Sequence, residues 1–172
     1  VTVSGGTGFT PGRYRIMARH SGKALDVTAA SLVNGATILQ WASSGSTNQQ
    51  WDIADLGGGQ YRIVAVHSGK SLDIEAASVA DGANVLQWSY GGVTNQRFKI
   101  ESVGSGYFRI VAVHSNKCLD VSASSIEDGA RVQQWTCLTR TNQQWTFVAV
   151  GSSTGARLVS ENVSSAASDT DE

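Results

Sequence analysis

Three stretches of the chain alternate apolar and polar residues with a period of two. They cover residues 14–18 (YRIMA), 61–66 (YRIVAV) and 108–113 (FRIVAV). This alternation, together with the β-branched residues, predicts three β-strands. The second and third stretches each begin 47 residues after the one before. The pattern therefore predicts an internal three-fold repeat as well as strands.

Each repeat contains signals for three more short strands. In the first repeat, a strand at 25–27 (LDV) follows a His-Ser-Gly-Lys turn, and a strand at 36–41 (ATILQW) follows an Asn-Gly turn. Asn-Gly and Asp-Gly favour tight turns because glycine accepts positive φ and the Asx side chain can bond its own backbone. A fourth strand is expected to begin at residue 48 (NQQW), and hairpin loops at 57–59 and 104–106 join the repeats.

One four-stranded unit cannot bury its own apolar face, so three units are expected to close around a shared core. The predicted fold is all-β, with one domain at 13–150 made of pseudo-symmetric repeats at 14–60, 61–107 and 108–150. Residues 1–12 are expected to form a linker or lead-in, and residues 151–172 a tail or linker with a last strand at 156–159. The chain starts at Val1 without Met, which indicates a mature protein or an excised fragment.

Composition argues against several classes of partner. Charged residues are only 16 % of the chain and the net charge is −1, which does not suit nucleic acid or an acidic membrane surface. No apolar run approaches the ~20 residues that a membrane helix needs. Cys118 and Cys137 both lie in the third repeat and fit a local disulfide better than a metal site, which needs about four ligands. Two free thiols are the alternative; a disulfide would indicate an extracellular or periplasmic location.

Four chemically distinctive positions recur in every repeat. An aspartate is followed 15 residues later by a tryptophan, and an Asn-Gln pair begins 7 residues after that. The full set is Asp26, Asp73 and Asp120; Trp41, Trp88 and Trp135; Asn48, Asn95 and Asn142; Gln49, Gln96 and Gln143. A large aromatic then opens the last strand, at Trp51, Phe98 and Trp145, and is expected in the core. The repeat therefore favours a site made three times over a single active site.

This unit resembles the ricin B-chain-type β-trefoil lectins, which include the carbohydrate-binding modules of family 13. Their signature Gln-x-Trp is present at 49–51 and 143–145, whereas the second repeat has Gln-Arg-Phe at 96–98. The resemblance covers about residues 13–150 and implies a β-trefoil with one shallow sugar pocket per repeat. The positions of Cys118 and Cys137 also resemble a common intra-repeat disulfide of that family.

The resemblance implies a role for each recurring residue. The aspartates would accept hydrogen bonds from two adjacent sugar hydroxyls, the Asn and Gln side chains would support that contact, and the tryptophans would form an aromatic wall. Such a site suits a pyranose, which has one apolar C–H face and a rim of hydroxyls. Many members also have a sugar-contacting Gln two residues before the aromatic; only Gln133 keeps it, while Leu39 and Leu86 replace it. This departure leaves Tyr90 as an alternative aromatic wall in the second repeat.

Structural alternatives remain open for these residues. An Asp in a short strand can cap a turn, an Asn before a strand can pin one, and the tryptophans can serve packing alone. The histidines of the His-Ser-x-Lys turns are expected to bond across the turn, with contact at the pocket rim as the alternative; they are His20, His67 and His114. Because a catalytic site is almost never built in triplicate, no catalytic residue is assigned, and no metal or cofactor is expected.

The sequence therefore favours a secreted, non-catalytic carbohydrate-binding domain with up to three sites. It would be a free-standing lectin or a module of a larger glycoside hydrolase. Galactose-type sugars, plant polysaccharides such as xylan and arabinan, and glycoconjugates are the expected ligands. The alternative is a protein-interaction or inhibitor β-trefoil that has lost sugar binding. The two differ in whether the Asp, Trp and Asn side chains converge in an open cleft or the carboxylates turn inward to backbone amides.

Overall fold

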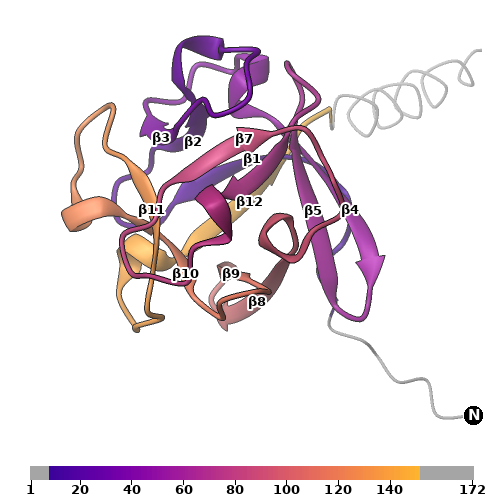
Figure 1. Ribbon diagram of the computed structural model, residues 1–172. Helices are drawn as coiled ribbons and strands as arrows, with labels where there is room; N and C mark the ends of the chain where they lie inside the picture. Colours follow the sequence, from indigo (N-terminus) through magenta and orange to yellow (C-terminus); the bar gives the residue numbers. More distant parts are fainter. Residues whose placement is uncertain (1–7, 152–172) are drawn as a thin grey trace, which may run out of the picture.

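The computed structural model describes residues 8–151, and the strand expected at 156–159 lies outside the described residues. Within them the chain forms twelve short strands, four per repeat (Figure 1). The first repeat contains β1 (Gly12–Ala18), β2 (Ala24–Val27), β3 (Ile38–Trp41) and β4 (Trp51–Gly57). The second contains β5 (Gln60–Ala65), β6 (Ser71–Ile74), β7 (Val85–Trp88) and β8 (Phe98–Gly104). The third contains β9 (Tyr107–Ala112), β10 (Cys118–Val121), β11 (Val132–Trp135) and β12 (Trp145–Ala149).

Two short 3₁₀ turns accompany the strands of every repeat. One follows the strand that carries the recurring aspartate: η1 (Thr28–Ala30), η3 (Glu75–Ala77) and η5 (Ser122–Ser124). The other precedes the last strand: η2 (Thr47–Gln49), η4 (Thr94–Gln96) and η6 (Thr141–Gln143). The fourth strand of the first repeat thus begins at Trp51 rather than at residue 48 as expected. This difference matters for the site, because side chains of successive strand residues point to opposite faces, whereas Asn48 and Gln49 in a turn reach the same partner.

Six of the strands form a closed antiparallel barrel. β1 pairs with β4, β4 with β5, β5 with β8, β8 with β9, β9 with β12, and β12 returns to β1. Closure removes the free edges that an open sheet would expose. The hairpins β4–β5 and β8–β9 turn through the Gly-rich loops that the sequence predicts.

The other six strands form three cap hairpins, β2–β3, β6–β7 and β10–β11. Single bridges connect each hairpin with the other two: Thr37 with Leu86, Leu39 with Arg131, and Asn84 with Gln133. A six-stranded barrel with three hairpins arranged in this way is a β-trefoil. The predicted all-β, three-fold fold class is confirmed.

The recurring large aromatics lie in the core, as expected. Trp51, Phe98 and Trp145 are completely buried. The indole N–H of Trp51 donates to the carbonyl of Leu25 at 3.1 Å, and that of Trp145 donates to Leu119 at 3.3 Å. These bonds satisfy the one polar atom of each indole, so the rings can be buried without leaving a donor unpaired.

Phe9 precedes the first strand and still belongs to the core. It is 9 % exposed, and its ring centroid lies 4.5 Å from that of Phe147 and 5.1 Å from that of Tyr14. The rings of Tyr61 and Phe108, which occupy the position of Tyr14 in the other repeats, lie 5.8 and 5.6 Å away. One side chain thus packs against three symmetry-related aromatics, and the repeat pattern does not signal it because it has no copies.

The repeats are joined by hydrogen bonds from buried glutamines and half-buried histidines to backbone carbonyls. Gln40 is fully buried; its Nε2 donates to the carbonyls of Ser125 and Glu127 at 2.8 and 2.9 Å, and its Oε1 accepts from Ser21 Oγ at 2.8 Å. His20 Nε2 donates to the same Ser125 carbonyl at 2.7 Å. The other two junctions repeat this arrangement with Gln87 and His67 on Ser31, and with Gln134 and His114 on Ser78. The histidines are therefore structural, but they bond a neighbouring repeat rather than across their own turn.

Replacing Gln40 with Ala should lower the free energy of unfolding by about 2–4 kcal/mol, because a fully buried side chain and its three hydrogen bonds are lost. Chemical denaturation followed by tryptophan fluorescence measures this change. Gln50→Ala is the matched control, since Gln50 makes one exposed bond to the Gly45 carbonyl and its loss should cost less than about 1 kcal/mol. Equal destabilisation by the two substitutions would contradict the proposed importance of the buried junction.

Candidate functional site

Each repeat contains one open cleft beside its cap hairpin. The clefts have volumes of about 480, 640 and 410 Å³ in the first, second and third repeats. Their common lining is the aspartate of the second strand, the tryptophan that ends the third strand, and the Asn of the turn before the last strand. The structure therefore brings the predicted Asp, Trp and Asn residues together three times.

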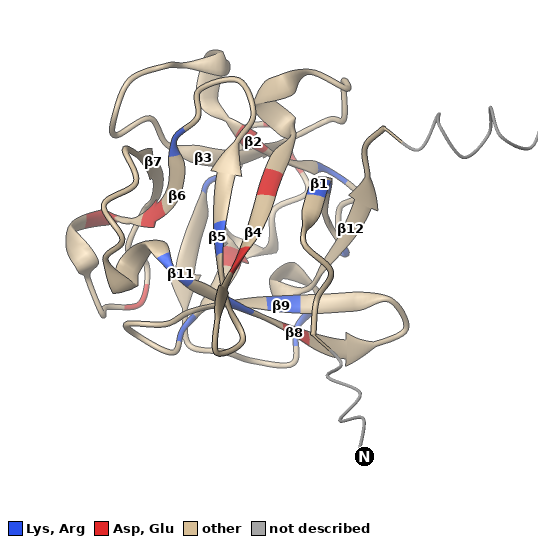
Figure 2. Cartoon of the chain, turned by 90° about the vertical axis from the view of Figure 1, so that its right-hand side faces the viewer, with Lys and Arg blue, Asp and Glu red and all other residues tan. Residues whose placement is uncertain are grey.

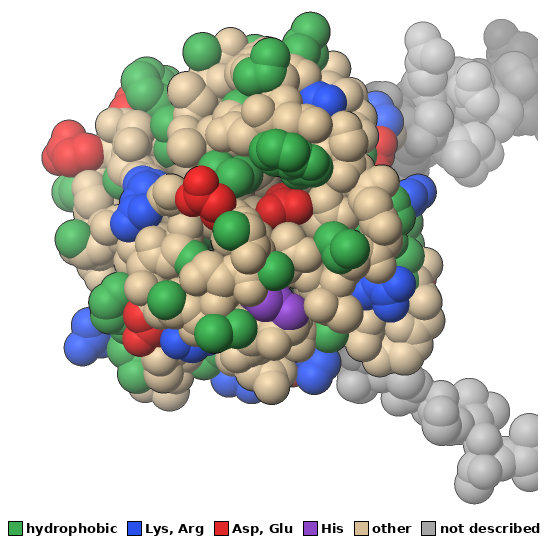
Figure 3. Space-filling model, in the orientation of Figure 1, with side chains coloured by type: hydrophobic (Ala, Val, Ile, Leu, Met, Phe, Trp, Pro, Cys, Tyr) green, Lys and Arg blue, Asp and Glu red, His purple; other side chains and the backbone are tan. Residues whose placement is uncertain are grey.

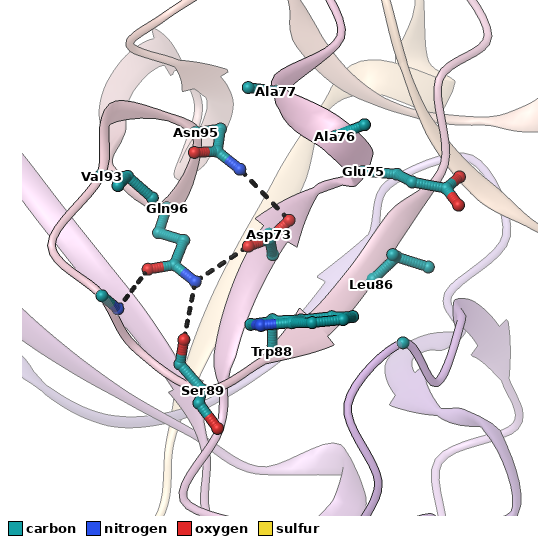
Figure 4. A pocket seen from close by; sticks show the side chains of 12 residues that line it. Asp73, Glu75, Ala76, Ala77, Leu86, Trp88, Ser89, Val93, Asn95 and Gln96 are labelled. Carbon is teal, nitrogen blue, oxygen red and sulfur yellow. Dashed lines mark hydrogen bonds between the residues drawn. The ribbon is translucent and has the colours of Figure 1, made fainter.

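In every cleft the aspartate accepts hydrogen bonds from side-chain amides. Asp73 is 6 % exposed and accepts from Gln96 Nε2 at 2.8 Å and from Asn95 Nδ2 at 3.3 Å (Figure 4). In the first cleft, Gln49 Nε2 and Asn48 Nδ2 lie 2.9 and 3.3 Å from Asp26 Oδ2. The corresponding distances to Asp120 Oδ2 are 2.9 Å from Gln143 and 3.2 Å from Asn142. The carboxylates are thus held by amide groups of the protein and border the clefts.

The backbone fixes the direction in which each glutamine amide points. Gln96 Oε1 accepts from the backbone N–H of Gly91 at 2.8 Å, so Nε2 must face Asp73 and the carbonyl of Ser89. Asn95 Nδ2 donates in addition to the carbonyl of Ile74 at 3.1 Å. Figure 4 shows Asn95 and Gln96 approaching Asp73 from the same side. With the amide orientations set in this way, each carboxylate is oriented before any ligand arrives.

Burial changes the acidity of two of these aspartates. It raises the pKa of Asp26 and of Asp73 above the ordinary value of 3.8, because a carboxylate is poorly solvated there. The hydrogen bond from Gln49 to Asp26, and that from Gln96 to Asp73, partly offset this rise in pKa, because they stabilise the charged form.

The tryptophan provides an accessible flat wall in each cleft. Trp41 and Trp88 are 46 % exposed and Trp135 is 38 % exposed, which is unusual for so large an apolar side chain. In the second cleft the ring of Trp88 lies with its face toward the side of the cleft that carries Asp73 (Figure 4). On the molecular surface, acidic side chains lie directly beside exposed hydrophobic ones (Figure 3). The arrangement suits a ligand with one apolar face and a rim of hydroxyl groups.

Small residues with positive φ form another part of the lining. In the second cleft these are Ala76 and Ala77, with φ of 54° and 50°. The equivalent residues are Ala29 and Ala30 in the first repeat, and Ala123 and Ser124 in the third. Non-glycine residues rarely adopt this conformation, and bulky ones least of all. The small-residue stretch in the sequence thus permits this backbone conformation, and its short side chains occupy little of the adjacent cleft.

Each tryptophan rests on the Asx-Gly turn of a neighbouring repeat. A Cβ atom on Gly129 of the third repeat would lie 3.5 Å from the Trp41 ring of the first. Asp128 Oδ1, beside that glycine, accepts from the backbone N–H of Ala42 at 2.9 Å, directly after Trp41. Equivalent contacts connect Asn34-Gly35 with Trp88 and Asp81-Gly82 with Trp135. The tryptophan wall of every cleft is therefore supported by another repeat, and the Asx side chain bonds the backbone of the repeat that carries the tryptophan rather than its own turn.

The remaining predicted residues are placed as follows. Gln133 lines the third cleft and donates to Asp120 Oδ1 at 3.1 Å, while Leu39 and Leu86 occupy this position in the other clefts. Tyr90 is not among the residues that line the second cleft; its ring lies 5.1 Å from the guanidinium carbon of Arg62. The aromatic wall in that cleft is Trp88. Gln96 and Gln49 line their clefts, whereas Gln143 reaches the third through Asp120.

Some lining residues differ between repeats and were not singled out from the sequence. Glu75 lines the second cleft, where the first and third repeats have Thr28 and Ser122. Arg140 lines the third cleft, where the first and second repeats have Ser46 and Val93. Aligning the repeats and looking for the positions that vary, rather than those that recur, would have found both.

The third repeat also contains the disulfide Cys118–Cys137. This confirms the disulfide in preference to two free thiols. Basic and acidic residues are interspersed along the described part of the chain (Figure 2). Residues 8–151 contain no group of three or more His, Cys, Asp or Glu side chains placed to hold a metal ion. Among the same residues, no helix has the length and apolarity to cross a membrane.

Asp128→Ala should alter the environment of Trp41 in the first repeat and leave Trp135 of its own repeat unchanged. The indole N–H resonances in a ¹H–¹⁵N spectrum of the folded protein report on each ring separately. Asn34→Ala is the matched control and should move the Trp88 resonance instead. A change confined to the tryptophan of the mutated repeat would show that the Asx-Gly turn does not support the tryptophan of another repeat.

A family model and individual relatives match this chain. The ricin-type beta-trefoil lectin domain-like family matches residues 3–88 and 94–170. The designed three-fold symmetric protein ThreeFoil is 51 % identical, with a TM-score of 0.80 over 80 % of this chain and 99 % of its own. An exo-β-1,3-galactanase from Clostridium thermocellum is 42 % identical, with a TM-score of 0.79 over 81 % of this chain and 30 % of the enzyme.

A curated relative matches a shorter segment. The clotting factor G alpha subunit of Tachypleus tridentatus is 49 % identical over 45 residues, which are 26 % of this chain and 7 % of that subunit. The match therefore spans only a small part of the relative's length. Since the family model covers more than half of the chain, and the β-trefoil carries the same carboxylate, amides and tryptophan in three clefts, the chain belongs to the ricin-type β-trefoil lectin domain-like family, a family of carbohydrate-binding domains.

Proposed function

We propose that this domain binds galactose-type sugars without catalysis, in three clefts that each accommodate one pyranose. The observation that carries the proposal is the combination of an amide-held aspartate and an exposed tryptophan in the same open cleft. The carboxylate would accept hydrogen bonds from two neighbouring hydroxyls of the sugar. The indole would cover the apolar C–H face.

The hydrogen-bond partners of the aspartate carboxylates favour a sugar-binding domain over a β-trefoil that has lost sugar binding. A carboxylate that served only to cap a turn would accept from backbone N–H groups. Asp26, Asp73 and Asp120 instead accept from the side-chain amides of the Asn-Gln pairs, and they line the clefts. A galactose-type ligand is favoured because the 42 % identical relative is a galactanase. Glycoconjugates or plant polysaccharides that carry such residues would be the natural ligands.

Three weak sites on one rigid body can act together. A single shallow sugar site has an affinity on the order of millimolar, or about −4 kcal/mol. A polymer or a glycosylated surface that engages two or three clefts gains from the high effective concentration of the second binding event. The domain would serve as a lectin or as a targeting module of a larger secreted enzyme. The disulfide fits an oxidising, extracellular setting.

Asp26→Ala, Asp73→Ala and Asp120→Ala should each remove one site and leave the other two. Titration with a galactoside, followed through the three indole resonances, should show loss of the response of Trp41, Trp88 or Trp135 respectively. Asp52→Ala is the control, since Asp52 pairs with Arg13 on the surface, outside the clefts. Unchanged binding in all three variants would refute the assignment. Absence of any sugar binding by the folded wild type would favour a protein-interaction β-trefoil.

Acid should weaken sugar binding at the first two clefts before it unfolds the domain. Protonation removes the acceptor, and burial raises the pKa of Asp26 and Asp73 above 3.8, so the loss should begin at a higher pH than for an ordinary aspartate. A raised folded-state pKa means that protonation of these groups favours the folded state, so their cost to stability disappears as the pH falls. Galactoside titrations between about pH 7 and pH 3.5, with circular dichroism at each pH, test this order. Unfolding that accompanies or precedes the loss would contradict it.

A further inference from the structure

The third cleft contains a cation whose guanidinium has no partner within the described structure. Residues 8–151 include eight arginines. Seven of them use the guanidinium in a hydrogen bond, an ion pair or a stack on an aromatic ring: Arg13, Arg15, Arg19, Arg62, Arg97, Arg109 and Arg131. Within the same residues, Arg140 has no such contact, and it lines the cleft that contains Asp120 and Trp135. The free donors of Arg140 thus border a candidate ligand site.

The other two clefts carry no counterpart of this charge. The position of Arg140 is occupied by Ser46 in the first cleft and by Val93 in the second. The second cleft has an additional carboxylate, Glu75, whose Oε2 accepts from Asn84 Nδ2 at 2.7 Å. Three sites of common design therefore differ in charge: the first has only its aspartate, the second has two carboxylates, and the third combines its aspartate with an arginine.

The loop that carries Arg140 is held in place near the cleft. Thr136, at its start, donates from its backbone N–H to Asp81 Oδ1 at 2.7 Å. Cys137 is tied to Cys118 of the strand β10 by the disulfide, which the other repeats lack. Leu138 N–H donates to Gln143 Oε1 at 2.7 Å. The backbone N–H of Gln143 donates to the carbonyl of Arg140 at 3.1 Å. The cation is therefore presented from a restrained backbone, which reduces the ordering cost of binding.

The aspartate of the third cleft is also held more completely than the others. Asp120 accepts from Gln133 at Oδ1 as well as from Asn142 and Gln143 at Oδ2. The residue is only 5 % exposed. Three amide donors directed at one carboxylate reduce the repulsion that an anionic ligand nearby would meet. Arg140 supplies the planar pair of donors that matches a carboxylate or a sulfate group.

We propose that the third cleft selects an anionic sugar, a pyranose that carries a carboxylate or a sulfate group which Arg140 binds. This inference rests on the proposed function, because it assigns a ligand class to one of the three sugar sites. The hydroxyls of the sugar meet Asp120, the ring covers Trp135, and the acidic group faces the guanidinium. The second cleft, with Asp73 and Glu75, disfavours the same ligand.

The test compares neutral and anionic forms of one sugar in a protein with a single cleft intact. Asp26→Ala combined with Asp73→Ala leaves the third cleft, and Asp73→Ala combined with Asp120→Ala leaves the first. Each protein is titrated with galactose, galacturonic acid and galactose 6-sulfate, which share the ring hydroxyls at C2, C3 and C4. The two acids distinguish a carboxylate from a sulfate as the preferred group.

The third-cleft protein should bind at least one of the acids about fivefold more tightly than galactose, the scale of an exposed ion pair. This preference should shrink as the ionic strength rises from about 10 mM to about 0.5 M, because salt screens exposed charges. Adding Arg140→Ser should remove the preference. Ser46→Arg in the first-cleft protein should create it. Arg109→Ser, which changes the net charge equally but pairs with Glu101 outside the clefts, should leave it unchanged.

The outcomes separate the inference from the proposed function. If galactose binds the first cleft and the third shows no preference for either acid, or a preference that survives Arg140→Ser, the inference is wrong and the proposed function stands. If the third cleft binds none of the three sugars while the first binds galactose, the inference is likewise wrong. If no cleft of the folded wild type binds any of them, the proposed function fails, and the assignment of an anionic sugar fails with it.

Discussion

A four-stranded unit of this length cannot bury its own apolar face, and the rest of the structure follows from this constraint. Three units share one core, with Trp51, Phe98 and Trp145 contributing one large anchor each. The barrel closes because β12 returns to β1, so no strand of the ring has a free edge. At the junctions between units, backbone carbonyls need donors, which the buried Gln40 and the half-buried His20 provide in one of them.

The junctions between repeats also position the clefts. The Asx-Gly turn of one repeat lies under the tryptophan of another. The carboxylate, its amides and the tryptophan of a cleft come from one repeat, and the support of that tryptophan comes from the preceding repeat around the barrel. Folding and ligand recognition thus depend on the same contacts, and loosening one junction affects a cleft whose carboxylate belongs to a different repeat.

The three-fold fold does not fix which residues occupy the rims of the clefts. The groups that orient the carboxylate also hold the backbone, so they recur in all three repeats. Residues at the rim, such as Thr28, Glu75 and Arg140, do not bond the carboxylate and differ from repeat to repeat. A three-fold body can therefore carry three clefts of one design with different charges.

The period, the strands, the core aromatics and the recurring Asp, Trp and Asn-Gln positions could be predicted from the sequence. These are local or periodic properties, and three copies make them visible. The contacts between repeats could not be predicted: Gln40 and His20 bond another repeat, Gly129 supports Trp41, and Phe9 joins the core. Such contacts join residues far apart in the chain, and no spacing along the sequence records which faces meet when three units close into a barrel.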